Sequence, residues 1–410
     1  MYIYKAAVIG AGTMGAQIAQ TISYSGLPVI LKDIKPDSVE RGLSMVRKIY
    51  QSRVDKGKMT AHEMEQKMAL VSGAVDYAGF GDVDLVIEAV FEDMAIKRRV
   101  FAEAEAACPD NAILATNTSS LPISALAAGR KHPEKVVGIH FFNPAHVMKL
   151  VEVIPGMATS SETVDDAVAF AESLRKIPVR VQECAGFLVN RLLMPYLNEA
   201  AMALQEIEKP EAALDEAKRL DAALVALGMP MGPFALTDMI GLDVAAKVAD
   251  VLYDSFGPRM TPAAMLAAMV KAGRMGAKSG AGIFAYDERN DAGALSRLLA
   301  DVQKQTGIRG TECTPNRVLL PLINEAVICL QEGVATASDI DVAMMAGTGF
   351  PQDKGGPLHY ADHVGLDVVL NEMERLTRAI GPRFWPAPML KRMVAAGFLG
   401  VKAKRGFFTY

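Results

Sequence analysis

The sequence predicts an α/β domain with a mostly parallel sheet, followed by two tandem copies of one all-α domain. Three observations predict this fold. Short β-rich runs alternate with helical stretches up to about residue 183, strand patterns nearly vanish beyond it, and the later part of the chain repeats itself. Alternating strands and helices are typical of a parallel sheet that helices cover on both faces.

The first domain is expected to cover residues 1–183. Its long polar stretch at residues 36–69 favours helix and would form a helical pair inserted after the second strand. A further helix is expected at residues 97–107. The expected strands are residues 5–10, 29–33, 85–89, 113–116, 136–141, 151–154 and 179–181.

The helical part of the chain carries an internal repeat. The segment that begins NRLLMPYLNEA at Asn190 returns as NRVLLPLINEA at Asn316, and Gly232 returns as Gly356, 124 residues later. This period is too long for a solenoid unit and therefore indicates a duplicated domain. The copies are expected at residues 184–287 and 312–410, with a linker between residues 287 and 312. Asn316 is interpreted as structural, because no nucleotide domain precedes it.

Composition excludes some classes of function. The chain has 410 residues, a net charge of −4, 51% apolar and 22% charged residues, so no overall basic field favours nucleic acid or a membrane surface. No apolar run approaches the roughly 18–20 residues that span a bilayer, and no signal-peptide pattern is present. The four cysteines form no metal-ligand pattern, so we expect reduced thiols, no metal and a cytoplasmic protein.

A glycine-rich run, GAGTMG, ends the first expected strand and opens the first helix. Gly10 permits the tight turn, Gly12 lets a pyrophosphate approach the backbone, and Gly15 lets helix and strand pack closely. The helix N-terminus, which includes Thr13 and Met14, then presents free N–H groups to the negative charge. The run predicts a dinucleotide site; the alternative is a glycine turn without a ligand.

Asp33 ends the second expected strand, 18 residues after Gly15. A carboxylate there can accept hydrogen bonds from the adenosine ribose hydroxyls, and it would repel a 2′-phosphate. The predicted cofactor is therefore NAD rather than NADP. In the alternative interpretation this aspartate is incidental.

His140 and Glu152 are the candidate catalytic pair. His140 lies at the carboxyl end of an expected strand, where ligands of open α/β sheets bind. Glu152 stands between valines in an apolar strand, so its carboxylate needs a partner such as an imidazole. Such a pair suits removal of a hydroxyl proton at neutral pH. The alternative is a buried structural histidine.

Polar residues at 117–120 end the strand before His140, and their hydroxyls and amide could position the substrate oxygen or the nicotinamide. The remaining histidines lack a comparable setting and are interpreted as surface or structural residues. They are His62, His132, His146, His359 and His363.

With these residues in place, the sequence resembles the 3-hydroxyacyl-CoA dehydrogenase family of fatty-acid β-oxidation over essentially the whole chain. The resemblance rests on VIGAGTMG at residues 8–15, EAVFE at 88–92, NTSSL at 117–121, HFFNP at 140–144, MKLVEV at 148–153 and GFLVNR at 186–191. It implies a Rossmann-type NAD-binding domain, followed by two tandem all-α domains of that family. The implied reaction is reversible, NAD-dependent oxidation of (S)-3-hydroxyacyl-CoA to 3-ketoacyl-CoA, in β-oxidation or 3-hydroxybutyryl-CoA metabolism.

The resemblance also implies roles for individual residues. His140 corresponds to the catalytic base and Glu152 to the glutamate that orients it. Ser119 corresponds to a serine that contacts substrate and histidine, and Asn190 to an asparagine near the substrate carbonyl. The implied contacts to the nicotinamide half of NAD are Glu92, Lys97, Asn117 and Asn143.

Lys56 and Lys58 are the local candidates for contacts to the CoA phosphates; the alternative is a solvated charged face. Short members of the family have one helical domain and form dimers. This chain has two copies, like the dehydrogenase half of the multifunctional β-oxidation enzymes, but no N-terminal hydratase domain, so hydratase activity is not implied. The two copies would pack against each other and permit a monomer, while a dimer stays open.

Two alternatives keep the fold and change the function. Hydroxyacid dehydrogenases of the 6-phosphogluconate type share a nucleotide domain and a helical domain but use a lysine where this chain offers His140 and Glu152. A catalytically inactive NAD-binding protein, like related crystallins, would keep the scaffold without the reaction. The intact residues Ser119 and Asn190 argue against that alternative.

Overall fold

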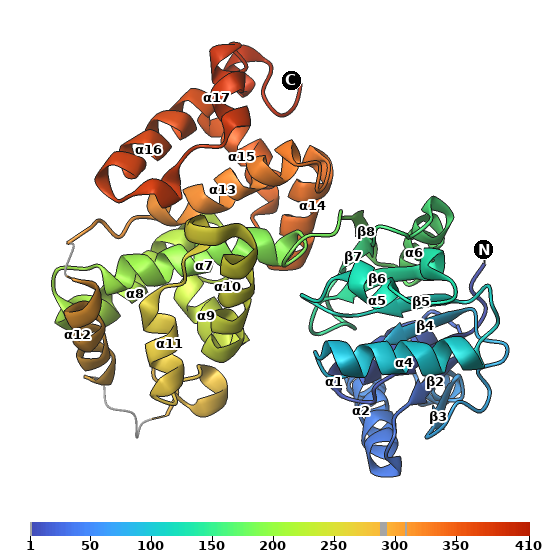
Figure 1. The fold of residues 1–410 in the computed structure, drawn as a ribbon. Helices are drawn as coiled ribbons and strands as arrows, with labels where there is room; N and C mark the ends of the chain where they lie inside the picture. Colours follow the sequence, from blue (N-terminus) through green and yellow to red (C-terminus); the bar gives the residue numbers. More distant parts are fainter. Residues whose placement is uncertain (1, 288–292, 308–309) are drawn as a thin grey trace. The chain divides into compact units, whose positions relative to one another are not determined.

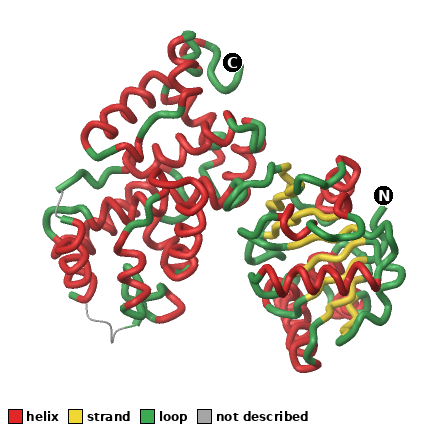
Figure 2. The backbone as a smooth tube through the Cα atoms, in the orientation of Figure 1, coloured by secondary structure: helices red, strands yellow, loops and turns green. Residues whose placement is uncertain are grey.

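The structure, a computed structural model, describes residues 2–287, 293–307 and 310–410. It divides into two compact units, Met1–Phe187 and Leu188–Tyr410. All the strands of the sheet belong to the first unit, and the second unit is helical, as Figure 2 shows. An α/β domain followed by helical domains is the fold that the sequence predicts.

The first unit is built on an eight-stranded sheet with the order β3-β2-β1-β4-β5-β6-β7-β8. Neighbouring strands are parallel except for the antiparallel pair of β6 and β7. This is a Rossmann-like sheet with an antiparallel extension. The strands are β1(Ala6–Ile9), β2(Val29–Lys32), β3(Val71–Ala74), β4(Leu85–Glu88), β5(Ile113–Thr116), β6(Val136–Phe141), β7(Leu150–Pro155) and β8(Ile177–Arg180).

The central strands β1, β2, β4 and β5 are buried along their whole length, which explains their continuous apolar sequences. The edge strand β3 was not among the expected strands. Its sequence, VSGA, contains serine and glycine and is only partly buried, so it lacks the β-branched pattern on which strand prediction depends.

Helices of the first unit cover the sheet (Figure 1). The predicted helical pair is confirmed as α2 and α3, and α2 packs on α1 through Tyr50 and Val46, which contact Ala16 and Met64. Thr60 begins α3 with a capping box. The helices are α1(Thr13–Tyr24), α2(Pro36–Asp55), α3(Ala61–Met68), α4(Met94–Ala107), α5(Ile123–Ala127) and α6(Ser161–Ser173).

The second unit contains the repeated sequence, and its helices α7 and α13 occupy equivalent positions in the two copies (Figure 1). These two helices make the most extensive packing of any pair of elements among the described residues. Its helices are α7(Val189–Gln205), α8(Ala213–Leu227), α9(Pro233–Ile240), α10(Leu242–Phe256), α11(Ala264–Lys271), α12(Ala294–Thr306), α13(Pro315–Gln331), α14(Ala337–Thr348), α15(Pro357–Val364), α16(Leu366–Ala379) and α17(Pro388–Ala395).

Helix α12 lies in the segment that was expected to be a linker. It packs against α8 and α11, and it buries Leu295, Leu299 and Val302, which recur at the spacing of one helix face. The segment between the two copies is therefore helical and packed over residues 294–306. Residues 288–292 and 308–309 of the same segment lie outside the described residues.

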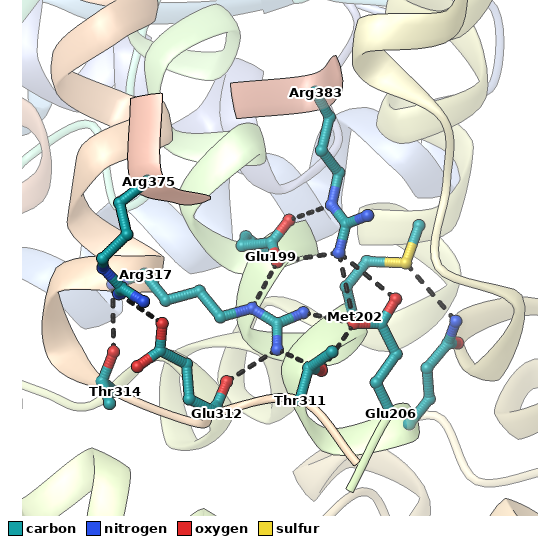
Figure 3. Close-up of polar contacts among 10 residues, drawn as sticks. Glu199, Met202, Glu206, Thr311, Glu312, Thr314, Arg317, Arg375 and Arg383 are labelled. Atoms are coloured by element: carbon teal, nitrogen blue, oxygen red, sulfur yellow. Dashed lines mark hydrogen bonds and ion pairs between the residues drawn. The ribbon is translucent and has the colours of Figure 1, made fainter. Parts of the chain in front are cut away.

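Reciprocal ion pairs join the two helical copies. Arg317 of α13 contacts Glu199 of α7 at 2.7 Å and Glu206, the residue that caps the end of α7, at 2.6 Å (Figure 3). In the opposite sense, Arg191 of α7 contacts Glu325 of α13 at 2.7 Å. The arginine side chains are 1% exposed or less. Because equivalent residues exchange the same contacts, the copies pack with approximate two-fold symmetry.

A second arginine from each copy extends this network. Arg383 contacts Glu199 at 2.7 Å, and Arg259, its equivalent in the first copy, contacts Glu325 at 3.2 Å. Figure 3 shows Glu199 between Arg317 and Arg383. Each buried carboxylate is thus neutralised by two guanidinium groups, which offsets part of the cost of removing these charges from water.

Candidate active site

At two of its three glycines, the turn after β1 leaves no room for a side chain. Gly10 has φ +107°, and a Cβ there would lie 2.5 Å from the carbonyl oxygen of Ala89. A Cβ on Gly15 would lie 1.7 Å from the carbonyl oxygen of Gly10. At Gly12, by contrast, a Cβ would have nothing within 4 Å. Packing therefore requires glycine at positions 10 and 15, and Gly12 borders open space.

Helix α1 begins at this open space with Gly12 as its N-cap and no capping side chain. Gly12 and Thr13 are exposed and Met14 is half-buried. Uncapped N–H groups at a helix N-terminus form an anion site, because the helix dipole and the donors act together. The turn therefore fits a dinucleotide pyrophosphate.

Asp33 follows β2 at the same edge of the sheet. Its Oδ2 accepts a hydrogen bond from the Ala11 N–H at 2.9 Å, which fixes the carboxylate beside the glycine turn. Among the described residues, its Oδ1 receives only the long contact from the Lys35 N–H at 3.5 Å. That oxygen can accept hydroxyl donors, as expected for a residue that contacts an adenosine ribose.

His140 and Glu152 face each other across the antiparallel pair of β6 and β7. The Nδ1 of His140 lies 2.7 Å from Oε2 of Glu152, and the residues are 7% and 0% exposed. A carboxylate accepts, so Nδ1 carries the proton and Nε2 of the neutral ring is left as an acceptor. Each strand supplies one member of the pair, and the strand register aligns them.

Two phenylalanines border the imidazole of His140. Its ring centroid lies 4.5 Å from that of Phe142 and 5.9 Å from that of Phe187. Phe187 is buried and adopts φ +50°, a conformation that is uncommon outside glycine. These rings restrict rotation of the imidazole. Sequence reasoning did not single them out, although both stand in the segments that carried the family resemblance.

Hydrogen bonds with Asn117, Gln17 and Lys176 hold the end of β6 and the loop after it. The Phe141 N–H donates to Oδ1 of Asn117 at 2.8 Å, and the Ala145 N–H donates to Oε1 of Gln17 at 2.7 Å. The ammonium of Lys176 donates to the carbonyl oxygens of Ala145 and Met148 at 2.6 and 2.8 Å. Burial lowers the pKa of Lys176 to about 8. These bonds hold the segment that follows His140.

Glu92 receives several hydrogen bonds from the segment after β5. Its Oε1 accepts from the Thr118 hydroxyl, from the Ser119 N–H at 3.1 Å and from the Ser120 hydroxyl at 3.2 Å. Its Oε2 lies 3.2 Å from the ammonium of Lys97. Burial opposes ionisation of Glu92, but Lys97 and these donors outweigh it and lower its pKa. Glu92 is therefore an anion at neutral pH.

The structure brings most of the predicted cofactor residues to the carboxyl edge of one sheet. Asn117 follows β5 and Asn143 is exposed just beyond β6. Lys97, which is expected to contact the nicotinamide half of NAD, has a side chain that is only 1% exposed. Lys56 and Lys58 are exposed in the turn between α2 and α3.

Asn190 lies in the first turn of α7, in the second unit, and is half-buried. Ser119 is half-buried in the first unit. One of the remaining histidines also has a carboxylate partner. His359 was set aside for lack of a suitable setting, yet its Nδ1 lies 2.7 Å from Oδ2 of the buried Asp341. The sequence separates these two residues too widely for the pairing to be recognised.

In the described part of the chain, no group of three or more histidine, cysteine, aspartate or glutamate residues could hold a metal ion. None of the helices that the structure describes is both long and apolar enough to cross a membrane. The four cysteines are free thiols.

Comparison with known proteins identifies the family. Residues 5–184 match the model of the NAD binding domain of 3-hydroxyacyl-CoA dehydrogenase, and residues 186–286 and 314–410 each match its C-terminal domain. The chain therefore belongs to the 3-hydroxyacyl-CoA dehydrogenase family. It is an oxidoreductase, and its cofactor is NAD.

Solved structures agree with this assignment. The chain is similar to 3-hydroxybutyryl-CoA dehydrogenase from Escherichia coli K12, with a TM-score of 0.84 and 32% identity over 97% of this chain and 100% of that one. It is also similar to (S)-3-hydroxybutyryl-CoA dehydrogenase from Ralstonia eutropha, with a TM-score of 0.66 and 36% identity over 70% of this chain and 100% of that one.

A third similar structure is the dehydrogenase part of multifunctional enzyme 1 from C. elegans. Its TM-score is 0.65 and its identity 28%, over 96% of this chain and 90% of that one. Together, the family models and these structures indicate 3-hydroxyacyl-CoA dehydrogenase activity.

Proposed function

We propose that the chain catalyses the reversible oxidation of (S)-3-hydroxyacyl-CoA to 3-ketoacyl-CoA with NAD, and that His140 is the general base. The observation that carries this proposal is the buried hydrogen bond of 2.7 Å between His140 Nδ1 and Glu152 Oε2. It leaves Nε2 as the nitrogen that can accept a substrate proton. The similar 3-hydroxybutyryl-CoA dehydrogenases support an acyl-CoA substrate.

In the proposed reaction, Nε2 of His140 takes the proton of the 3-hydroxyl group. Bound NAD supplies the acceptor for the hydride that leaves C3. The carboxylate of Glu152 stabilises the resulting imidazolium, because an opposite charge at hydrogen-bond distance favours the charged form. In the reverse direction the imidazolium returns its proton to the keto oxygen. General base catalysis of this kind contributes roughly 10²–10⁴-fold to a rate.

The substrate contacts are also part of the proposal. Ser119 would contact the substrate and His140, and Asn190 would lie near the substrate carbonyl. Lys56 and Lys58 would bind CoA phosphates. Their exposure supports this role, because a flexible ammonium at a surface turn can reach a phosphate as a point charge.

The deciding experiment is an assay of the purified chain with NADH and acetoacetyl-CoA, repeated with longer 3-ketoacyl-CoA thioesters and with NADPH. We expect turnover with NADH, and His140→Gln should lower kcat by about 10²–10⁴-fold while NADH binding stays nearly unchanged. His62→Gln, on the exposed face of α3, is the matched control. Near wild-type turnover of His140→Gln would refute the general base. Binding of NADH without turnover on any thioester would favour an inactive NAD-binding protein.

Three further points belong to the proposal. The domain boundaries would be residues 1–183, 184–287 and 312–410, with the two helical copies paired inside one monomer. The reciprocal contacts of Arg191 and Arg317 support that pairing. Gel filtration with light scattering should show a monomer, and an obligate dimer formed through the helical domains would contradict it. A cytoplasmic location is consistent with the four free thiols.

A further inference from the structure

Glu88 is a buried carboxylate for which the reaction has no direct use. It ends β4 and is 0% exposed. Its Oε1 accepts from the Val90 N–H at 2.6 Å and from Lys97 at 2.7 Å. Its Oε2 accepts from the Thr116 hydroxyl at 2.7 Å and from Lys97 at 2.9 Å. With four hydrogen bonds, this carboxylate has no capacity left for a ligand.

Lys97 lies between Glu88 and Glu92. Its ammonium contacts both oxygens of Glu88 and, at the longer distance of 3.2 Å, Oε2 of Glu92. These three acceptors match the three protons of an ammonium group. The Lys97 side chain is 1% exposed, so water is largely excluded from the ammonium and the two carboxylates supply its main contacts.

Glu92 is the member of this group that reaches solvent, with a side chain that is 25% exposed. Its Oε1 is occupied by donors from Thr118, Ser119 and Ser120. Its Oε2 has the longer contact to Lys97, which leaves that oxygen able to accept a further hydrogen bond. The charges of Glu88, Lys97 and Glu92 sum to one net negative charge, which is accessible to solvent at Glu92.

We propose that Glu88 is a positioning residue of the dinucleotide site. By holding two of the three protons of Lys97, it prevents that ammonium from closing fully on Glu92, so Glu92 keeps one carboxylate oxygen for a hydroxyl or amide donor of the bound dinucleotide. This inference rests on the proposed contact between Glu92 and NAD. Without Glu88, Lys97 pairs with Glu92 alone and competes with the ligand.

The test is a fluorescence titration of the full chain with NADH, combined with steady-state kinetics. Glu88→Gln should raise the Kd and the KM for the dinucleotide about tenfold, the effect of one hydrogen bond to a charged group, with a much smaller change in kcat. Because Glu88 acts through Lys97, its substitution should have little further effect on a Lys97→Gln protein. Additive effects of the two substitutions would overturn the inference.

Two controls separate positioning from structural loss. Glu103→Gln removes a carboxylate from the exposed face of α4, the helix that carries Lys97, and should leave Kd unchanged. Glu88→Asp keeps the charge but shortens the side chain by one carbon, so it cannot hold both Lys97 protons and should raise Kd severalfold even if Glu88→Gln does not fold. If the substitutions of Glu88 lower the unfolding temperature but leave Kd unchanged, Glu88 is merely structural.

Failure of the inference is distinguishable from failure of the proposed function. If Glu92→Gln leaves NADH affinity unchanged, the proposed contact of Glu92 is wrong. If Glu92→Gln weakens NADH binding and both Glu88→Gln and Glu88→Asp do not, only the role of Glu88 is wrong.

Discussion

In the proposed reaction, Glu152 would act on the substrate through the imidazole of His140. It is fully buried, and its Oε2 accepts the hydrogen bond from Nδ1. Glu152→Gln should lower kcat by about 10²–10⁴-fold, because an amide can donate to Nδ1 and favour the wrong tautomer. The measurement is single-turnover oxidation of NADH with acetoacetyl-CoA. Glu162→Gln, in the first turn of α6, is the control, and equal rates in both variants would contradict this role of Glu152.

Asp33 should determine the preference of the chain for NADH over NADPH. Asp33→Asn removes the charge that would repel a 2′-phosphate and weakens an acceptor for the ribose hydroxyls. We expect the Kd for NADH to rise roughly 10–100-fold, while binding of NADPH improves relative to NADH. Asp37→Asn, in the exposed first turn of α2, is the matched control. Unchanged selectivity in Asp33→Asn would contradict the assignment.

The sequence was informative about single residues where a local pattern was present. The bond between His140 and Glu152 was expected from a lone carboxylate in an apolar strand near a histidine, and it is present. The contacts of Glu88 with Thr116 and Lys97 were not foreseen. They join residues from β4, β5 and α4, and only the sheet order determines that these meet.

The segment between β6 and β7 should show a pH-dependent contribution to stability through Lys176. Burial and the nearby Lys149 lower the pKa of Lys176 from 10.5 to about 8. Between these two pH values the unfolded chain holds a proton that the folded chain has lost, so the free energy of unfolding rises with pH. The destabilising cost of the buried ammonium is present in full below about pH 8.

Lys176→Met removes this titration. The unfolding temperature of the variant, measured relative to wild type, should therefore fall as the pH is raised from neutral toward 10. Thermal unfolding followed by circular dichroism at several pH values tests this. Lys48→Met, at an exposed position of α2, is the control for loss of a charge. A difference in unfolding temperature that does not change with pH would contradict the expectation.

Elements with strong apolar periodicity were predictable, and two others were not. The buried strands β1, β2, β4 and β5 have continuous apolar sequences, and the helical pair α2 and α3 has an amphipathic pattern. Strand β3 is a polar edge strand, and its pairing with β2 supplies its stability. Helix α12 was missed because it lies between the two repeated segments, and the repeat alone set the expected domain boundaries on either side of it.

For the whole molecule, the buried ion pairs between the helical copies predict a large loss of stability when one partner is removed. Arg317→Met leaves Glu199 and Glu206 with one arginine fewer in a buried position. Removing one partner of a buried ion pair costs about 3–5 kcal/mol, so urea should unfold the variant at a clearly lower concentration. Arg375→Met is the control, because Arg375 is 45% exposed and exposed pairs contribute about 0–1 kcal/mol. Equal losses in both variants would contradict the importance of the buried network.

The duplication itself was predictable, because the repeated segments at Asn190 and Asn316 are long and similar. The ion pairs between the copies could not be predicted in the same way. Arg191 and Glu325 are 134 positions apart, and the local sequence around each residue does not indicate the other as its partner. The pairing follows only from the approximate two-fold packing of α7 against α13.

The reciprocal pairing has a consequence for dilution. Two separate chains that met through such contacts would separate as their concentration fell, because association depends on the frequency of encounter. Here Arg191 and Glu325, like Arg317 and Glu199, belong to one polypeptide. The connecting segment keeps their effective concentration high however few molecules are present. The paired helical body should therefore persist even in very dilute solution, with one nucleotide-binding unit for every two helical copies.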